Sequence, residues 1–297
     1  MRRSLLAPLR RSLLPSLGLL ALSACPAHAV TLIATFNDTS TGTPVGKGGG
    51  TGFTGNWSGS ASSLIIAGDL TSTLYNMPQS GTALSLRNAN NGSARQNFRN
   101  VATSPTGEVW FSFLTRTQTS ADGLGTESAG ISLNTPSTAS PYDNRGDVYF
   151  QMTGNDLVYS FGAGTAGSVN INPATPGVAA NKLTLIVGRM VINGGGAADT
   201  ISLWADPDLI ANSNINAYTP VFTGSGVNAL DSITLLGAIT YQNATPGLGG
   251  GIVDNIRFSD GAGNPMQAYM DVTGVPEPSV LALALLGVSS LSGRRRR

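Results

Sequence analysis

The segment "EVWFSFLTR", residues 108–116, sets the fold class of the whole chain. Successive side chains of a strand point to opposite faces, so Phe111 and Phe113 share one face. Trp110 and Leu114 share the other. Because large apolar residues occupy both faces, the segment predicts a strand that is covered on both sides.

A second decisive segment is "KLTLIVGRMVINGGGAADTISLWAD", residues 182–206, in which two apolar runs flank a Gly-rich connection. It predicts a β-hairpin. Elsewhere, short runs rich in β-branched and aromatic residues alternate with turn signals such as "NANNGS" and "INPATPG". Strands are predicted at residues 31–36, 64–67, 83–87, 108–117, 129–133, 147–152, 156–161, 182–192, 200–205, 232–241 and 251–259.

About eleven antiparallel strands without a helix predict an all-β sandwich of two sheets. Each sheet must bury one apolar face, and antiparallel strands can be joined by short turns. No segment of 20 to 50 residues repeats along the chain, which argues against a solenoid or a propeller.

The N-terminal end predicts a secretory signal peptide over residues 1–29. Four arginines precede an apolar run at 13–24, and the small residues Ala27 and Ala29 form a site for signal peptidase, with cleavage after Ala29. A competing motif, "LSAC", resembles a lipobox in which Cys25 would become a lipidated N-terminus. Both alternatives export the rest of the chain.

The C-terminal end, "VPEPSVLALALLGVSSLSGRRRR", covers residues 275–297. The uncharged run at 279–293 would span about 22 Å as a helix, against roughly 30 Å of bilayer hydrocarbon. It predicts a short transmembrane helix. The basic cluster after it stays on the cytoplasmic side, which leaves the preceding chain outside.

This order of parts resembles the PEP-CTERM sorting signal of exported bacterial proteins. The matching residues are Pro276, Glu277 and Pro278, followed by the apolar run and by Arg294, Arg295, Arg296 and Arg297. The resemblance implies an exosortase-type membrane peptidase as a partner, removal of the tail near the motif, and a cell-surface or extracellular-matrix destination. A plain C-terminal anchor that no peptidase reads is the alternative.

The remaining body, residues 30–274, carries nine Lys and Arg against 15 Asp and Glu, a formal charge of −6. An acidic body disfavours nucleic-acid binding, which needs a basic face. The single Cys25 and the single His28 of the chain both lie in the predicted signal peptide. After cleavage, disulfides, imidazole bases, thiolate nucleophiles and Cys/His zinc sites are therefore excluded from the body.

Five segments of the body resemble strands of concanavalin A-like, laminin-G-type domains of bacterial PEP-CTERM proteins. They are "EVWFSFLTRTQ", "AGISL", "KLTLIVGRMVI", "DTISLWADPDL" and "GGIVDNIRFSDG". The likeness spans roughly residues 50 to 260 and implies a two-sheet jelly-roll sandwich. That fold hosts sugar binding, adhesion and glycoside hydrolysis, so it does not choose among them.

Hydrolysis of glycosides needs two facing carboxylates. The only glutamates of the body, Glu108 and Glu127, lie 19 residues apart, and the Glu-x-Asp-x-x-Glu motif of glucanases with this fold is absent. We expect both to be solvated charges and the protein not to be an enzyme. An Asp/Glu-dependent carbohydrate-active enzyme is the alternative.

Calcium is the metal that the oxygen donors of this chain would suit, although no cofactor is required. Two loops group such donors, and a strand holds two more that could join them. The candidate ligands are Asp206 and Asp208, then Asp143, Asn144 and Asp147, then Asp254 and Asn255. None has the spacing of an EF-hand, and short Asp-rich loops more often cap their own turns. A calcium-dependent adhesin is a second alternative.

A sugar site needs exposed aromatic rings beside polar partners. Trp204 alternates with Leu203 and shares its face with polar residues, which predicts a half-exposed ring. Trp57 is expected in a flexible Gly-rich loop. Each could instead cover the edge of the core. The expected function is that of an exported, non-enzymatic structural or carbohydrate-associating module, with extracellular polysaccharide as a partner.

Overall fold

The computed structural model describes residues 29, 31–36, 40–59, 63–68, 70–77, 81–86, 95–117, 128–134, 148–153, 156–161, 166–170, 182–193, 197–227, 230, 232–240 and 251–275. The predicted signal peptide, apart from Ala29, and the predicted sorting signal from Pro276 onward lie outside these residues. Within them, no helix has the length and apolar character needed to cross a bilayer.

The described residues form two antiparallel sheets, so the predicted all-β sandwich is confirmed. Sheet A runs in the order β13-β12-β11-β6-β15-β4-β3, with β1 beside β15. Its strands are β1 (Thr31–Ala34), β3 (Leu64–Ala67), β4 (Thr82–Ser85), β6 (Gly107–Arg116), β11 (Leu183–Ile192), β12 (Ala198–Ala205), β13 (Phe222–Val227) and β15 (Ile252–Ser259).

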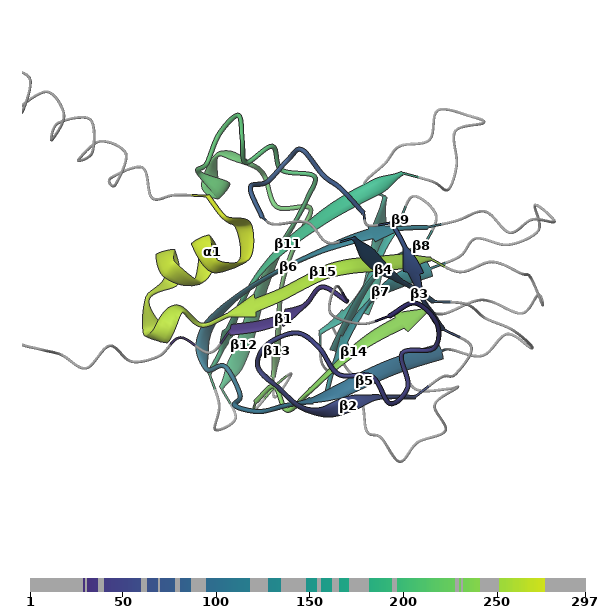
Figure 1. The fold of residues 1–297 in the computed structure, drawn as a ribbon. Helices are drawn as coiled ribbons and strands as arrows, with labels where there is room; N and C mark the ends of the chain where they lie inside the picture. The colour runs from purple at the N-terminus through teal and green to yellow at the C-terminus, as the bar shows by residue number, and fades with distance from the viewer. Residues whose placement is uncertain are drawn as a thin grey trace, which may run out of the picture.

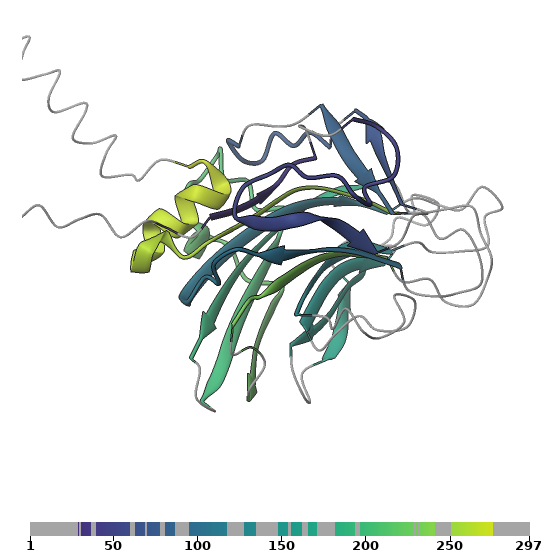
Figure 2. The same cartoon turned by 60° about the horizontal axis from the view of Figure 1, so that its bottom comes forward.

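Sheet B runs in the order β10-β9-β8-β7-β14-β5-β2 and lies against sheet A, as Figure 2 shows. Its strands are β2 (Phe53–Gly59), β5 (Arg95–Val101), β7 (Ser128–Leu133), β8 (Val148–Thr153), β9 (Asp156–Phe161), β10 (Ala166–Asn170) and β14 (Leu235–Thr240). The sequence did not predict β2, β5, β10 or β13, whose residues are rich in Gly, Ser, Thr or Asn.

The prediction for strand β6 is confirmed, because it pairs with β11 and β15 in the middle of sheet A and is buried on both faces. Phe111 points between the sheets, where its ring stacks on Phe150 of sheet B at 5.4 Å and on Phe258 at 5.1 Å. The predicted hairpin is also confirmed, since β11 pairs with β12. The main core therefore lies between the two sheets.

A second apolar cluster covers the outer face of sheet A. Trp110 and Leu114 of β6 belong to it, together with residues of 70–77, of 207–218 and of a helix, α1 (Pro265–Thr273). Helix α1, seen at the left of Figure 1, packs against β6 and β15, on the side of the sheet away from the main core. The central part of the outer face of this sheet is thus covered as well.

Helix α1 makes the prediction of a helix-free body wrong. Its boundaries have ordinary causes: Asn264 accepts the N–H groups of Met266 and Gln267, a proline occupies the first turn, and Gly274 ends the helix with φ +68°. A β-carbon on Gly274 would lie 2.1 Å from the carbonyl oxygen of Asn76. Val275, the residue before the predicted sorting motif, is buried.

Candidate functional site

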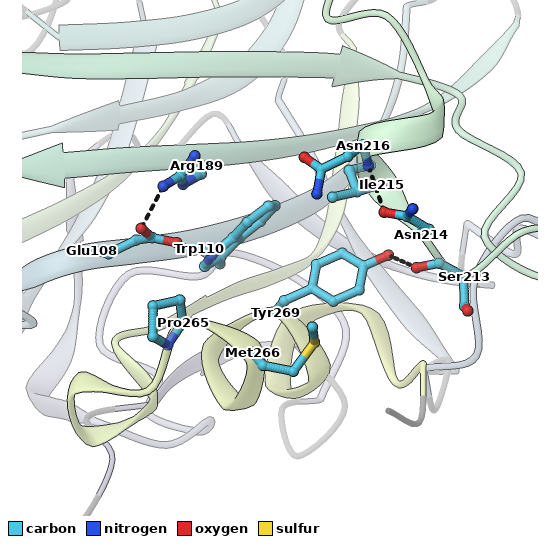
Figure 3. A pocket seen from close by; sticks show the side chains of 10 residues that line it. All are labelled: Glu108, Trp110, Arg189, Ser213, Asn214, Ile215, Asn216, Pro265, Met266 and Tyr269. Carbon is cyan, nitrogen blue, oxygen red and sulfur yellow. Dashed lines mark hydrogen bonds and ion pairs between the residues drawn. The ribbon is translucent and has the colours of Figure 1, made fainter. Parts of the chain in front are cut away.

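A cavity of about 540 Å³ opens on the outer face of sheet A (Figure 3). Strands β6 and β11 form its floor. The first two turns of α1 form one wall and residues 213–216 form another. Three segments distant in sequence therefore meet around a single space.

The polar end of the cavity floor is formed by side chains that the pairing of β6 with β11 brings together. Glu108 and Trp110 are two residues apart and share the outer face of β6, and Arg189 of β11 pairs directly with Trp110. The guanidinium Nη2 of Arg189 donates to Glu108 Oε2 at 2.6 Å. The indole Nε1 of Trp110 donates to Glu108 Oε1 at 2.9 Å. The carboxylate of Glu108 is therefore fixed by two donors.

The apolar end of the floor is a stack of rings. Trp110 lies at 5.8 Å from Trp204, nearly parallel, and Tyr269 of α1 meets the edge of Trp110 at 5.0 Å. The indole of Trp204 donates to the carbonyl of Tyr218 at 3.0 Å. Because every ring is held by neighbours, this part of the cavity is preorganised.

Two contacts close the wall opposite the strands. The hydroxyl of Tyr269 donates to the carbonyl of Ser213 at 2.8 Å, which joins α1 to residues 213–216. Burial raises the pKa of Tyr269 to about 12. Asn214 Oδ1 accepts the N–H of Asn216 at 3.1 Å, and the amide of Asn216 borders the cavity. Met266 lies on the rim and is 44% exposed.

The charges of the cavity balance. Among its described lining residues, Glu108 is the one acid and Arg189 the one base. Their side chains are 19% and 43% exposed, so the pair stays in contact with solvent. The cavity offers fixed polar groups without a net charge.

Trp204 lies beneath the cavity rather than beside it. Its face of β12 is the outer one, as its alternation predicts, but residues 207–218 and Trp110 cover the ring, and Trp204 is 4% exposed. The prediction of a half-exposed platform is therefore wrong. The alternative given for Trp204, a ring that covers the edge of the core, describes its position.

Trp57 belongs to strand β2 and not to a flexible loop, so that prediction is also wrong. Its ring is buried, 5.4 Å from the ring of Phe36, and the guanidinium of Arg99 lies over it at 5.8 Å. Gly55 gives β2 a φ of +68°, and its carbonyl accepts from Arg99 at 2.7 Å. A buried arginine thus orders this Gly-rich segment.

Glu108 keeps contact with solvent, but it is more than a solvated charge, because both its oxygens accept hydrogen bonds from protein donors. Glu127 lies outside the described residues. Sequence reasoning did not single out Trp110, Arg189 or Tyr269. One sequence signal could have indicated the site. Glu108 and Trp110 are two residues apart, so they share one face of a strand that was expected to be covered on both faces.

The aspartates of the 206–208 loop already have protein partners, which are distant in sequence for Asp206 and local for Asp208. Asp206 Oδ1 accepts the N–H of Leu185 at 2.7 Å and its Oδ2 pairs with Lys182 at 2.8 Å, whereas Asp208 Oδ1 accepts the N–H of Ala211 at 2.9 Å. The described residues contain no group of three or more His, Cys, Asp or Glu side chains suited to a metal ion. Calcium binding at this loop therefore gains no support.

The other calcium candidates separate into two groups. Asp143, Asn144 and Asp147 lie outside the described residues. Asp254 and Asn255 are buried at a bulge of β15, where the N–H of Leu70 donates to Asp254 at 3.2 Å and the amide of Asn255 donates to the Tyr75 hydroxyl at 2.8 Å. These two side chains belong to a buried hydrogen-bond network.

No protein-family model matches the chain, and no curated protein matches it. Among solved structures, the chain is similar to peanut lectin with a nine-residue peptide, at 11% identity and a TM-score of 0.36, over 77% of this chain and 97% of the lectin. It is similar to the carbohydrate recognition domain of Emp47p, at 10% identity and 0.38, over 77% and 94%. It is also similar to a glycosyl hydrolase family protein from Mycobacterium fortuitum, at 11% identity and 0.34, over 59% and 74%.

Proposed function

We propose that the chain is an exported surface protein whose sandwich associates with carbohydrate through the cavity beside α1, without catalysing a reaction. The observation that carries the proposal is the composition of that cavity: immobilised aromatic rings, a solvent-accessible ion pair and an amide converge on one open space. Small-molecule sites have this mixture of apolar lining and a few fixed polar groups.

Carbohydrate suits the cavity because a sugar ring has an apolar C–H face and a polar hydroxyl edge. Met266 supplies the exposed apolar surface, and the small exposed parts of Tyr269 and Trp110, 5% and 6% of these residues, border the cavity behind it. Arg189 and Glu108 supply donors and acceptors on the floor of the same cavity. A ring lying across the cavity would meet both kinds of surface at once.

The ends of the sequence support export and sorting. The N-terminal residues 1–29 have the parts of a signal peptide, and residues 275–297 have the parts of a PEP-CTERM signal. In this proposal signal peptidase and an exosortase-type peptidase process the chain, the C-terminal helix holds it in the membrane before processing, and the product resides in the cell envelope or extracellular matrix. The intact mass of the protein recovered from its native envelope would locate both cleavage sites.

The number of carboxylates that line the cavity favours a binding role over hydrolysis. Glycosidases use two carboxylates that face each other across the scissile bond. The described lining of the cavity contains one, Glu108, and two protein donors hold it. Turnover of any β-glucan or acidic polysaccharide that disappears in Glu108→Gln would establish the enzymatic alternative instead.

Binding to an array of glycans, followed by calorimetry on the strongest ligand, tests the proposal. Met266→Ala and Asn216→Ala remove exposed groups at the cavity rim and should each weaken binding by roughly three- to tenfold. Ile210→Ala is the matched control, because this side chain is exposed and does not line the cavity. Absence of any glycan ligand, or equal affinity of all four proteins, would contradict the proposal.

A further inference from the structure

We infer that the cavity selects neutral sugars, and that it holds them by two adjacent hydroxyl groups that bridge Arg189 and Glu108. This inference rests on the proposed function and adds the class of ligand. It follows from the hydrogen-bonding capacity of the ion pair, from the charge balance of the cavity and from the position of its apolar surface.

The ion pair presents a donor edge beside an acceptor edge. Arginine has five N–H donors, and one hydrogen bond from Arg189, through Nη2 to Glu108, fixes the guanidinium beside the carboxylate. Each oxygen of Glu108 accepts one protein donor and retains acceptor capacity. One hydroxyl can therefore accept from Arg189 while its neighbour donates to Glu108.

Adjacent hydroxyls on a sugar ring match this arrangement. Their oxygens lie about a hydrogen-bond length apart, and each can donate or accept. The partners cost little rearrangement, because Trp110 holds Glu108 in place and Glu108 holds Arg189. Hydrogen bonds to charged groups are also stronger than those between neutral groups.

The charge balance disfavours acidic sugars. The positive charge of Arg189 is already matched by Glu108 at 2.6 Å, so a ligand carboxylate would be repelled by Glu108 or would have to displace it. Displacement would also remove the acceptor of the Trp110 indole. A body with a formal charge of −6 adds a weaker repulsion at long range.

The apolar wall sets the orientation of the ring. Met266 is exposed on the rim, and Tyr269 and Trp110 continue the apolar surface inward from it. A sugar whose hydroxyl edge lies on the ion pair can place its C–H face against Met266. Recognition by one edge and one face leaves the remaining hydroxyls free for glycosidic links, so an internal or terminal residue of a polymer would fit.

Calorimetry with oligomers of a neutral hexose and of the corresponding uronic acid, matched in linkage and length, tests the inference. We expect the neutral oligomer to bind at least about tenfold more tightly. We also expect its affinity to change less than about twofold between low and high salt, because no net charge is neutralised.

Glu108→Gln gives the sharpest arm of the test. The amide preserves the shape of the side chain and an acceptor for Trp110, but leaves the Arg189 cation unmatched. Affinity for the neutral oligomer should fall and affinity for the uronate should rise, so that the selectivity ratio shifts at least about tenfold toward the uronate. Ile210→Ala should leave the ratio unchanged, and the melting temperature of each variant confirms that it is folded.

The outcomes separate the inference from the proposed function. If the wild-type protein prefers the uronate and Met266→Ala weakens that binding, the selectivity is wrong and the carbohydrate site stands. If Glu108→Gln leaves the selectivity ratio unchanged, the bridging role of the ion pair is wrong. If neither oligomer nor any other glycan binds, the proposed function itself fails.

Discussion

Replacing Tyr269 by Phe tests the contacts that connect α1 to residues 213–216 and to the floor of the cavity. The substitution keeps the ring that meets the edge of Trp110 but removes the hydroxyl that donates to Ser213 at 2.8 Å. One lost hydrogen bond is worth about 1 kcal/mol at neutral pH. For a body of this size, that loss lowers Tm by roughly 2–4 °C.

Alkaline pH should reverse this difference. Burial raises the pKa of Tyr269 from 10.0 to about 12, so the folded state holds the phenolic proton more tightly than the unfolded state does. The resulting stability is fully present below pH 10 and is lost as the pH rises toward 12. The complete loss is about 3 kcal/mol and roughly half of it falls below pH 11, so the stability curves of the two proteins should cross near pH 11.

Urea denaturation of both proteins from pH 7 to pH 12 measures the difference directly. The remaining tyrosines and lysines are common to both proteins, so their titration cancels in the comparison. We expect Tyr269→Phe to be the less stable protein at pH 7 and the more stable one at pH 12. A difference that keeps the same sign and size at every pH would refute the buried, hydrogen-bonded position of this phenol.

Three further substitutions test the fold, and a fourth tests the calcium alternative. Gly188→Ala places a β-carbon 2.0 Å from the Phe111 ring and should cost roughly 1–3 kcal/mol or more by urea denaturation, with partial rescue by Phe111→Leu. Unchanged stability would contradict the pairing of β11 with β6. Asn264→Ala removes the cap of α1 and should cost about 1 kcal/mol, with equal stability arguing against the helix start. Asp199→Ala leaves the buried N–H of Leu230 and the partly buried N–H of Asn193 without their acceptor and should cost roughly 1–3 kcal/mol, whereas unchanged stability would contradict those contacts. Asp206→Asn should leave the response of Tm to millimolar Ca²⁺ unchanged, because protein donors already engage its oxygens.

The central strands could be predicted because their signal is local. In β6, alternate residues are apolar on both faces, and this pattern alone indicates a covered strand. Strand β5, with the sequence RQNFRNV, could not be found in this way. Its Asn97 and Arg99 are buried, and Arg99 donates to carbonyls of Gly49 and Gly55, more than 40 residues away in sequence. Such a strand becomes recognisable only after its partners are placed.

Helix α1 could have been predicted, since Asn264, Pro265 and Gly274 are ordinary start and stop signals. The cavity is a different case. Glu108 and Arg189 are 81 residues apart, and only the register of β6 against β11 makes them neighbours. Trp204 lies on the face of β12 that alternation predicts, but Trp110 and residues 207–218, which are distant or irregular in sequence, cover its ring. Trp57 was expected in a loop, but its ring is buried beside Phe36 and Arg99.

The buried position of Val275 would have a mechanical consequence if the proposed C-terminal helix holds the protein in the membrane. The next residue, Pro276, is the first of the proposed sorting motif, so no linker separates this motif from the buried end of the sandwich. A force applied to the motif would therefore act directly on the C-terminal end of α1. Peeling this nine-residue helix away from its C-terminal end would carry off Tyr269 and Met266. Anchorage and sugar contact would then bear load through the same helix, so a sufficient pull on the tether would release the polysaccharide.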